Sequence, residues 1–162
     1  MVVQDKVGVG SLTEDEPVEI HLNLSVSVSG NSILSSLSEP SPLTEFEENI
    51  GINVEQGLHS ILITLSGEEG VDALAFDSET PIRWFEGLTP DTLGDPPPGV
   101  THGLISDIQL GIFVHNTITS SEPERRLFRL RFHVSPANEP PTPIHHDPIL
   151  IELPPGSEEY RR

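Results

Sequence analysis

Histidine is the residue type in this sequence that most readily suggests metal chemistry. A zinc site on a β-sheet usually takes histidines two residues apart, because alternate residues of a strand share a face, and no His-x-His pair occurs. The segment HHD at 145–147 has two imidazoles and a carboxylate, but neighbouring side chains of an extended segment point in opposite directions. We therefore expect no metal site among the seven histidines, which are His21, His59, His102, His115, His133, His145 and His146.

Carboxylates in two turn-rich segments offer the hard oxygen ligands that Ca²⁺ prefers. Asp77 and Glu79 lie in DSET, and Asp91 and Asp95 lie in PDTLGDPPPG. The D-x-[DN]-x-[DN]-G calcium loop is absent, and acidic loop residues are more often simply solvated. No cofactor is expected, and calcium stays open as an alternative.

Catalytic patterns are absent from the chain. It has no cysteine to act as a thiol nucleophile, no GxSxG segment, and no glycine-rich loop that opens a helix to bind phosphate. No spacing singles out a Ser, His and Asp set. We expect no catalytic residues and no enzymatic activity.

Trp84 is the only tryptophan, and it lies in the segment PIRWF just before the loop 87–103. An exposed Trp84 could stack on a sugar beside Asp91 and Asp95, which would indicate a lectin-like ligand-binding domain. A buried Trp84 would instead anchor a core that is poor in aromatic residues. Burial is the favoured interpretation, and ligand binding is kept as an alternative.

The segment RRLFRLRFHV, 125–134, holds four of the eight Lys and Arg residues in a chain whose formal charge is −18. In a strand, Arg125, Arg129 and Arg131 share one face, and we call these three residues the arginine stripe. The opposite face carries Phe128, Leu130, Phe132 and Val134. The stripe predicts either ion pairs with Glu19 or Glu152 on a neighbouring strand, or a contact with the acidic surface of another protein or another copy.

The negative charge lies mainly in the first half: residues 1–81 have a net charge of −14, and residues 82–162 have −4. Such a charge repels nucleic acid and anionic membranes, so we expect neither direct nucleic-acid binding nor membrane insertion. The first residues lack the basic and apolar regions of a secretory signal, which favours the cytoplasm. An acidic protein could also mimic nucleic acid and inhibit a basic protein.

Period-two alternation predicts strands through most of the chain. VEIHLNLSVSVS, 18–29, alternates apolar and polar residues without interruption. Seven to eight strands are expected, with a hairpin across GEEG and another across SSEPE. They occupy 18–29, 52–54, 59–66, 71–76, 81–85, 105–117, 125–134 and 148–154.

Connectors rich in Pro, Gly and Ser separate these strands. The segments 87–103 and 136–148 are expected to be extended or turn-forming, and 30–49 has room for one helical turn around Ile33, Leu34 and Leu37. The sequence thus predicts an all-β fold: one antiparallel β-sandwich of immunoglobulin-like or jelly-roll-like connectivity, with a small barrel as the alternative. A single domain covers 1–162, with an N-terminal arm at 1–16 and a polar tail at 154–162.

These observations favour a non-enzymatic interaction module that forms a subunit of a homo-oligomer or a larger protein assembly. Its partner would be a second copy or another subunit, contacted through Arg125, Arg129 and Arg131. The alternatives are the lectin-like domain, with Trp84, Asp91 and Asp95 in the ligand site, and the acidic inhibitor of a basic protein.

Overall fold

The alternating segment 18–29 forms a strand over its whole predicted length in a computed structural model of the chain. The structure describes residues 17–29, 32–38, 43–46 and 49–156, so the predicted arm at 1–16 and most of the tail lie outside the described residues. All regular structure there is β-strand, which confirms the all-β prediction. The strands are β1 (Val18–Ser29), β2 (Ser32–Ser38), β3 (Leu43–Phe46), β4 (Asn49–Val54), β5 (Gly57–Gly67), β6 (Val71–Phe76), β7 (Ile82–Trp84), β8 (Val100–Ser106), β9 (Gln109–Asn116), β10 (Glu124–Pro136), β11 (Thr142–His146) and β12 (Ile149–Glu152).

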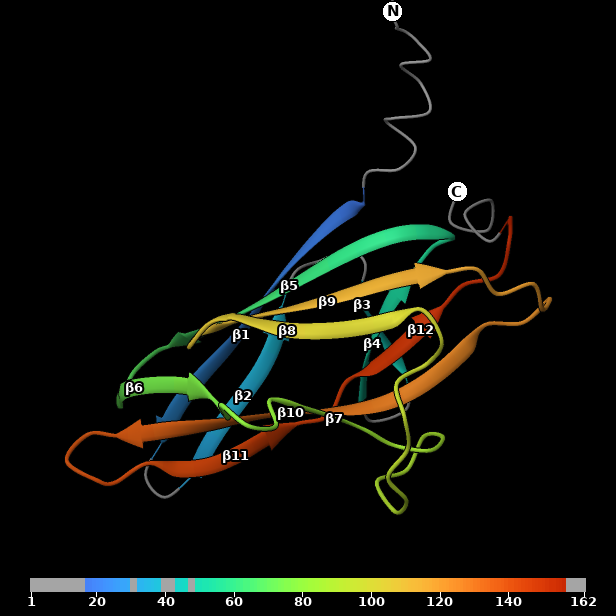
Figure 1. Ribbon diagram of the computed structural model, residues 1–162. Helices are drawn as coiled ribbons and strands as arrows, with labels where there is room; N and C mark the ends of the chain where they lie inside the picture. The colour runs from blue at the N-terminus through green and yellow to red at the C-terminus, as the bar shows by residue number, and fades with distance from the viewer. Residues whose placement is uncertain (1–16, 30–31, 39–42, 47–48, 157–162) are drawn as a thin grey trace, which may run out of the picture.

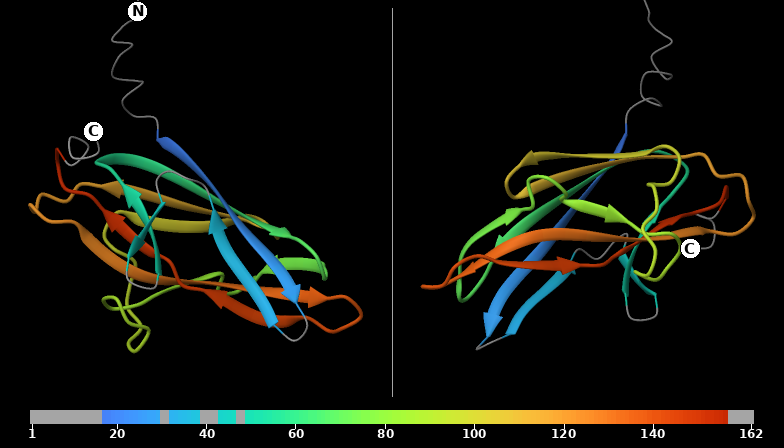
Figure 2. Two further views of the ribbon diagram at one scale, coloured as in Figure 1. Left: turned by 180° about the vertical axis from the view of Figure 1, so that it is seen from behind. Right: turned by 60° about the horizontal axis from the view of Figure 1, so that its bottom comes forward.

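The strands form two sheets that lie one above the other (Figures 1 and 2). The first sheet has the strand order β2-β1-β5-β9-β8. The second has the order β11-β10-β12-β4-β3, and β6 and β7 pair with β10 as well. β10, the longest of the described strands at 13 residues, pairs with four neighbours in this sheet, which are β11, β12, β6 and β7.

Both sheets are mixed, so the prediction of a purely antiparallel sandwich is wrong. β1 pairs in parallel with β5, and β12 pairs in parallel with β4. A parallel pair needs a long connection between its strands, and the segment 30–56 supplies one between β1 and β5. The sequence pattern identifies strands but carries no direct signal for which strands pair.

Both predicted hairpins are wrong as well. β5 and β6 follow each other across GEEG, but β5 pairs with β1 and β9, while β6 pairs with β10. β9 and β10 also lie in different sheets. The predicted strand 105–117 is in fact the end of β8, a turn and β9. The hairpin in this part of the chain is the antiparallel pair of β8 and β9.

Connector segments hold strands that were not predicted. The segment 30–49 contains β2 and β3 in place of the expected helical turn, and β2 pairs with β1 along its whole length. The segments 87–103 and 136–148 contain most of β8 and all of β11. Twelve described strands therefore replace the seven to eight expected, because short edge strands with polar or small residues lack a clear apolar alternation.

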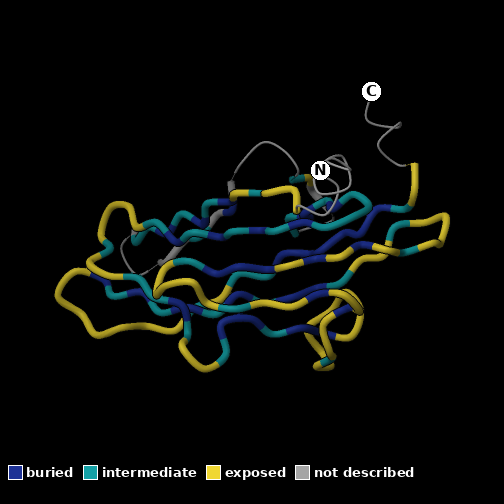
Figure 3. The backbone as a smooth tube through the Cα atoms, turned by 45° about the horizontal axis from the view of Figure 1, so that its top comes forward, coloured by how far each residue is buried: buried dark blue, intermediate teal, exposed yellow. Residues whose placement is uncertain are grey.

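The main hydrophobic core lies between the two sheets, where the inward residues of both meet (Figure 3). Leu24, Ile63 and Ile112 come from the first sheet, and Phe128 and Phe132 come from the second. All five are almost completely buried. Leu24 and Ile63 therefore lie on the inward face that the alternation predicted for them. Within the described ranges there is no helix long and apolar enough to cross a membrane.

Candidate functional site

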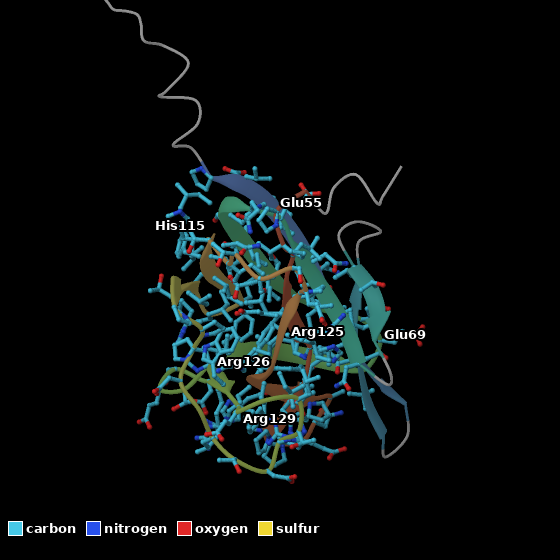
Figure 4. All side chains as sticks on the ribbon, turned by 90° about the vertical axis from the view of Figure 1, so that its right-hand side faces the viewer. Glu55, Glu69, His115, Arg125, Arg126 and Arg129 are labelled. Atoms are coloured by element: carbon cyan, nitrogen blue, oxygen red, sulfur yellow. The ribbon has the colours of Figure 1, made fainter. Side chains whose placement is uncertain are left out.

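The outer face of β10 carries the arginine stripe, as its alternation predicted. Phe128, Leu130, Phe132 and Val134 are buried on the inner face, whereas Arg129, Arg131 and His133 are half-buried on the outer face. In Figure 4 the labelled arginines of this strand lie below Glu55 and His115. Leu127 shares the outer face but is buried in a second apolar cluster, formed with Phe85, Ile149, Ile151 and Leu153.

Arg129 makes a two-point contact with a carboxylate. Its Nε donates to Oδ1 of Asp147 at 2.9 Å, and its Nη2 donates to Oδ2 at 3.0 Å. The guanidinium also lies 5.2 Å from the ring centre of Phe85. The hydrogen bond with Asp147 raises the pKa of Arg129, against the opposing effect of burial. This two-point geometry is the one that best suits an arginine and a carboxylate.

Arg131 contacts a tight turn after β6. Its Nη1 donates to the carbonyl oxygen of Thr80 at 3.3 Å, and its Nη2 lies 3.9 Å from Oδ2 of Asp77. Asp77 accepts the backbone N–H groups of Glu79 and Thr80 through Oδ1. The bond from Thr80 is the main cause that lowers the pKa of Asp77. This carboxylate therefore shapes its own turn.

The prediction that the arginine stripe pairs with Glu19 or Glu152 is wrong. Glu19 lies on β1, in the other sheet, where its Oε1 is 3.2 Å from Nε2 of His21. Glu152 lies on β12 directly opposite Glu124 of β10, at the end of the strand pair. Pairing of the stripe within its own sheet does occur, but it uses Asp147 and Asp77.

Glu152 is only 3% exposed, and sequence reasoning gave it no role of its own. Its burial raises its pKa to about 7, and the charge of Glu124 adds to this effect, while Arg126 opposes it. Arg126 also donates from Nη1 to the carbonyl oxygen of Asp95 at 2.8 Å. A buried titratable carboxyl thus lies at the end of β12, opposite Glu124 of β10.

The HHD segment makes separate contacts, as the geometry of an extended chain requires. Nδ1 of His146 lies 3.2 Å from Oγ of Ser35, and Nε2 of His145 lies 4.0 Å from Oδ2 of Asp147. Burial lowers the pKa of His146. These residues line an open pocket of about 290 Å³ together with Asn49 and Ile50. Among the described residues, no group of three or more His, Asp or Glu side chains is placed to hold a metal ion.

Trp84 is buried, with 4% of its surface exposed, and its ring centre lies 4.9 Å from that of Phe128. In this position Trp84 cannot stack on a sugar, so it is the core anchor that the sequence favoured. Asp91 and Asp95 are exposed on the loop that follows β7. The three residues of the predicted ligand site are thus divided between the core and the surface.

The outer face of the first sheet is almost free of charge, which the sequence analysis missed. We call this surface, contributed by β1, β5, β9 and β8, the neutral face. Glu19 is its single acidic residue. Register and burial assign to it Glu19, His21, Asn23, Ser25, Ser27, Leu58, Ser60, Leu62, Thr64, Ser66, Gln109, Gly111, Phe113, His115, Thr101, Gly103 and Ile105. A count of charge over the paired strands could have found it, but only with the strand order known.

Apolar side chains gather on the neutral face beside β8. Ile105 and Phe113 are 59% and 47% exposed, and both approach Gly111 between them. A Cβ atom on Gly111 would lie 3.3 Å from Cδ1 of Ile105 and 3.6 Å from the ring of Phe113. Leu62 is the neighbour of Gly111 on β5. The small glycine therefore lets the two large side chains converge over it and form one apolar patch.

No protein-family model matches the chain, and no curated protein is similar to it in sequence. Among solved structures, the chain is similar to the crystal structure of an inclusion body protein, PixA, from Burkholderia cenocepacia J2315. The two are 8% identical, the TM-score is 0.43, and the match covers 92% of this chain and 99% of the other. A likeness this distant carries no argument about function.

Proposed function

We propose that this chain is a non-enzymatic protein-interaction module that assembles into a homo-oligomer or a larger protein complex through its neutral face. The observation that carries the proposal is the near absence of charge on that face in a chain with a net charge of −18. Acidic copies repel each other wherever their carboxylates approach within the screening length, about 8 Å at physiological ionic strength. Electrostatic repulsion between two copies is therefore weakest at a surface without carboxylates.

The composition of the neutral face fits a binding surface. Ile105 and Phe113 supply an apolar centre, and serine, threonine and asparagine surround it. Strands lie about 4.8 Å apart and rise about 3.3 Å per residue, so four strands of about eight residues present roughly 500 Å². Two such faces would together bury about 1,000 Å², near the lower limit for a specific interface.

The arginine stripe is the second candidate contact for the same function. The outer face of the second sheet carries Arg83 beside Arg129, and Arg131 beside His145, with Asp77 and Asp147 as the acidic residues in contact with them. This balance makes the face more basic than the rest of the chain. A contact through Arg125, Arg129 and Arg131 would bind an acidic surface, such as that of another copy.

Light scattering coupled to gel filtration, over a range of protein and salt concentrations, tests the proposal. We expect the wild type to assemble, and assembly through the neutral face should strengthen with salt because salt screens the repulsion between acidic copies. Assembly through the arginine stripe should weaken with salt. A protein that stays monomeric under all these conditions would contradict both contacts.

Two variants with a matched charge change localise the contact. Phe113→Glu places a carboxylate at the centre of the neutral face and should abolish assembly. Leu93→Glu makes a comparable change at a residue that is 57% exposed on the loop after β7, and assembly should remain. Equal loss in both variants would mean that added charge alone, and not the neutral face, controls assembly.

A further inference from the structure

The free edge of β8 differs from the other sheet edges. β11 contains Pro143 and β3 has only four residues, and proline and short length are both common means of limiting unwanted strand pairing at an edge. β2, at the other end of the first sheet, approaches the second sheet through the contact between Ser35 and His146. β8 has neither charge nor proline along its seven residues, VTHGLIS, and it is the outermost strand of its sheet in Figure 1.

The backbone of β8 presents hydrogen-bonding groups on this edge. The N–H of His115 donates to the carbonyl oxygen of Gly99 at 2.9 Å, so hydrogen-bonded pairs with β9 recur at every second residue. Thr101 and Gly103 therefore pair toward β9. The N–H and C=O groups of His102 and Leu104 point the other way, toward the open edge, where Leu104 is 38% exposed.

We infer that β8 pairs with β8 of a second copy, in antiparallel orientation about a two-fold axis at Gly103, so that the two five-stranded sheets become continuous. The inference rests on the proposed assembly of this chain and names a second copy as the partner, but it places the contact at the β8 edge of the first sheet and not across the neutral face. In this register His102 of one copy exchanges hydrogen bonds with Leu104 of the other, and the reverse pair follows by symmetry.

The register follows from which backbone groups are available. A two-fold axis at His102 would pair Val100 with Leu104, but the N–H of Val100 already donates to the carbonyl oxygen of Pro97 at 3.1 Å. An axis at Leu104 would use Ser106, which lies beyond the irregularity in the β8–β9 pairing. The axis at Gly103 uses only His102 and Leu104.

The side chains are compatible with this arrangement. Gly103 would face Gly103 of the second copy at a non-hydrogen-bonded position, where Cα atoms approach to about 4.5 Å and large side chains would crowd. On the outer face, Ile105 of each copy would lie beside Thr101 of the other, which extends the apolar patches across the junction. Asp107 is the single charged residue between Gly99 and Asn116, so the two copies meet with little electrostatic repulsion.

Charge also selects a second copy over an unrelated partner. A basic protein would be attracted to the acidic surfaces of this chain and would gain nothing from an uncharged strand. Another acidic copy would be repelled from those surfaces, but it would meet little electrostatic repulsion at β8. The two-fold arrangement closes after two copies, so each dimer would leave no β8 edge open.

Disulfide cross-linking tests the register, because the chain contains no cysteine. Gly103→Cys introduces one thiol where a Cβ atom meets nothing within 4 Å in the single copy. With oxidised glutathione as the oxidant, we expect rapid formation of a covalent dimer, since the expected Cα separation is within the range that a disulfide spans. Thr64→Cys, on β5 two strands away, is the control and should cross-link only slowly.

Leu104→Pro removes the outward N–H without removing a bond to β9, and it should weaken dimer formation at least tenfold. Leu104→Lys places a charge at the edge and should also weaken dimer formation. This variant serves as the test if the proline variant fails to fold. A wild type that assembles while Gly103→Cys cross-links no faster than Thr64→Cys would overturn the edge pairing and leave the neutral face as the contact. A wild type that never assembles would overturn the proposed function itself.

Discussion

Arg129 of β10 and Asp147, which directly follows β11, form a two-point ion pair with N–O distances of 2.9 and 3.0 Å. The pair joins β10, the longest strand of the second sheet, to the connection between β11 and β12. Asn49 of β4 donates to the carbonyl oxygen of the same Asp147 at 2.8 Å. Three segments of one sheet therefore meet at a single aspartate.

Arg129→Met should lower the free energy of unfolding by about 1 to 3 kcal/mol, because it leaves a mostly buried carboxylate without its charged partner. Urea unfolding measures this change. Arg131→Met is the matched control and should cost less than about 1 kcal/mol, since its ion pair is long and more exposed. Equal costs for the two variants would contradict a special role for the Arg129–Asp147 pair.

Glu152 should make the stability of the fold depend on pH near neutrality. Burial and Glu124 raise its pKa from 4.5 to about 7 in the folded chain, so the folded state binds a proton more tightly than the unfolded state does. Between about pH 4.5 and 7 the unfolding free energy should therefore fall as pH rises. The total loss should be about 3 kcal/mol at most, since one pKa unit corresponds to about 1.4 kcal/mol.

Unfolding of Glu152→Gln across this pH range isolates the effect. The difference in unfolding free energy between the variant and the wild type should grow from pH 5 to pH 8 in favour of the variant. Glu124→Gln removes the neighbouring charge and should reduce the dependence without abolishing it. A constant difference between pH 5 and pH 8 would show that Glu152 does not titrate in this range.

His59 is a polar residue in an apolar position. It lies on the inward face of β5, is 5% exposed, and neither ring nitrogen has a hydrogen-bond partner within the described part of the chain. His59→Leu should therefore raise the unfolding free energy by about 1 to 2 kcal/mol, because it removes an unsatisfied buried polar group. His21→Leu, on the exposed face of β1, should change it by less than about 0.5 kcal/mol. A loss of stability in His59→Leu would point to a partner for the imidazole.

The strands that the sequence predicted correctly are those with one clearly apolar face. β1, β5 and β10 alternate over many residues, and their buried positions match the pattern. Strand pairing could not be predicted in the same way, because the alternation in β5 is compatible with pairing to β6, β1 or β9. Long-range packing decides between them, and the local pattern does not contain that information.

The candidate sites divide in the same way. The outward direction of Arg129 and Arg131 follows from local alternation, and it was predicted. Their acidic partners lie 18 and 54 positions away in the chain and depend on the strand order, so they could not be predicted. The neutral face requires four strands from separate parts of the sequence. Two of them, β1 and β5, come from the half of the chain with a net charge of −14, so charge counted along the chain could not reveal this face.

Gly99, immediately before β8, should tolerate no other residue without loss of stability. Its φ of +81° is in the left-handed region, and a Cβ atom would lie 2.7 Å from the carbonyl oxygen of His115. Gly99→Ala should therefore lower the unfolding free energy by about 1 to 3 kcal/mol, measured by urea unfolding at a protein concentration low enough to keep the chain monomeric. Gly103→Ala adds the same methyl group in open space within β8, and its cost should be below about 1 kcal/mol. Equal losses of unfolding free energy for the two substitutions would show that the left-handed backbone conformation of Gly99 does not limit which residue can stand before β8.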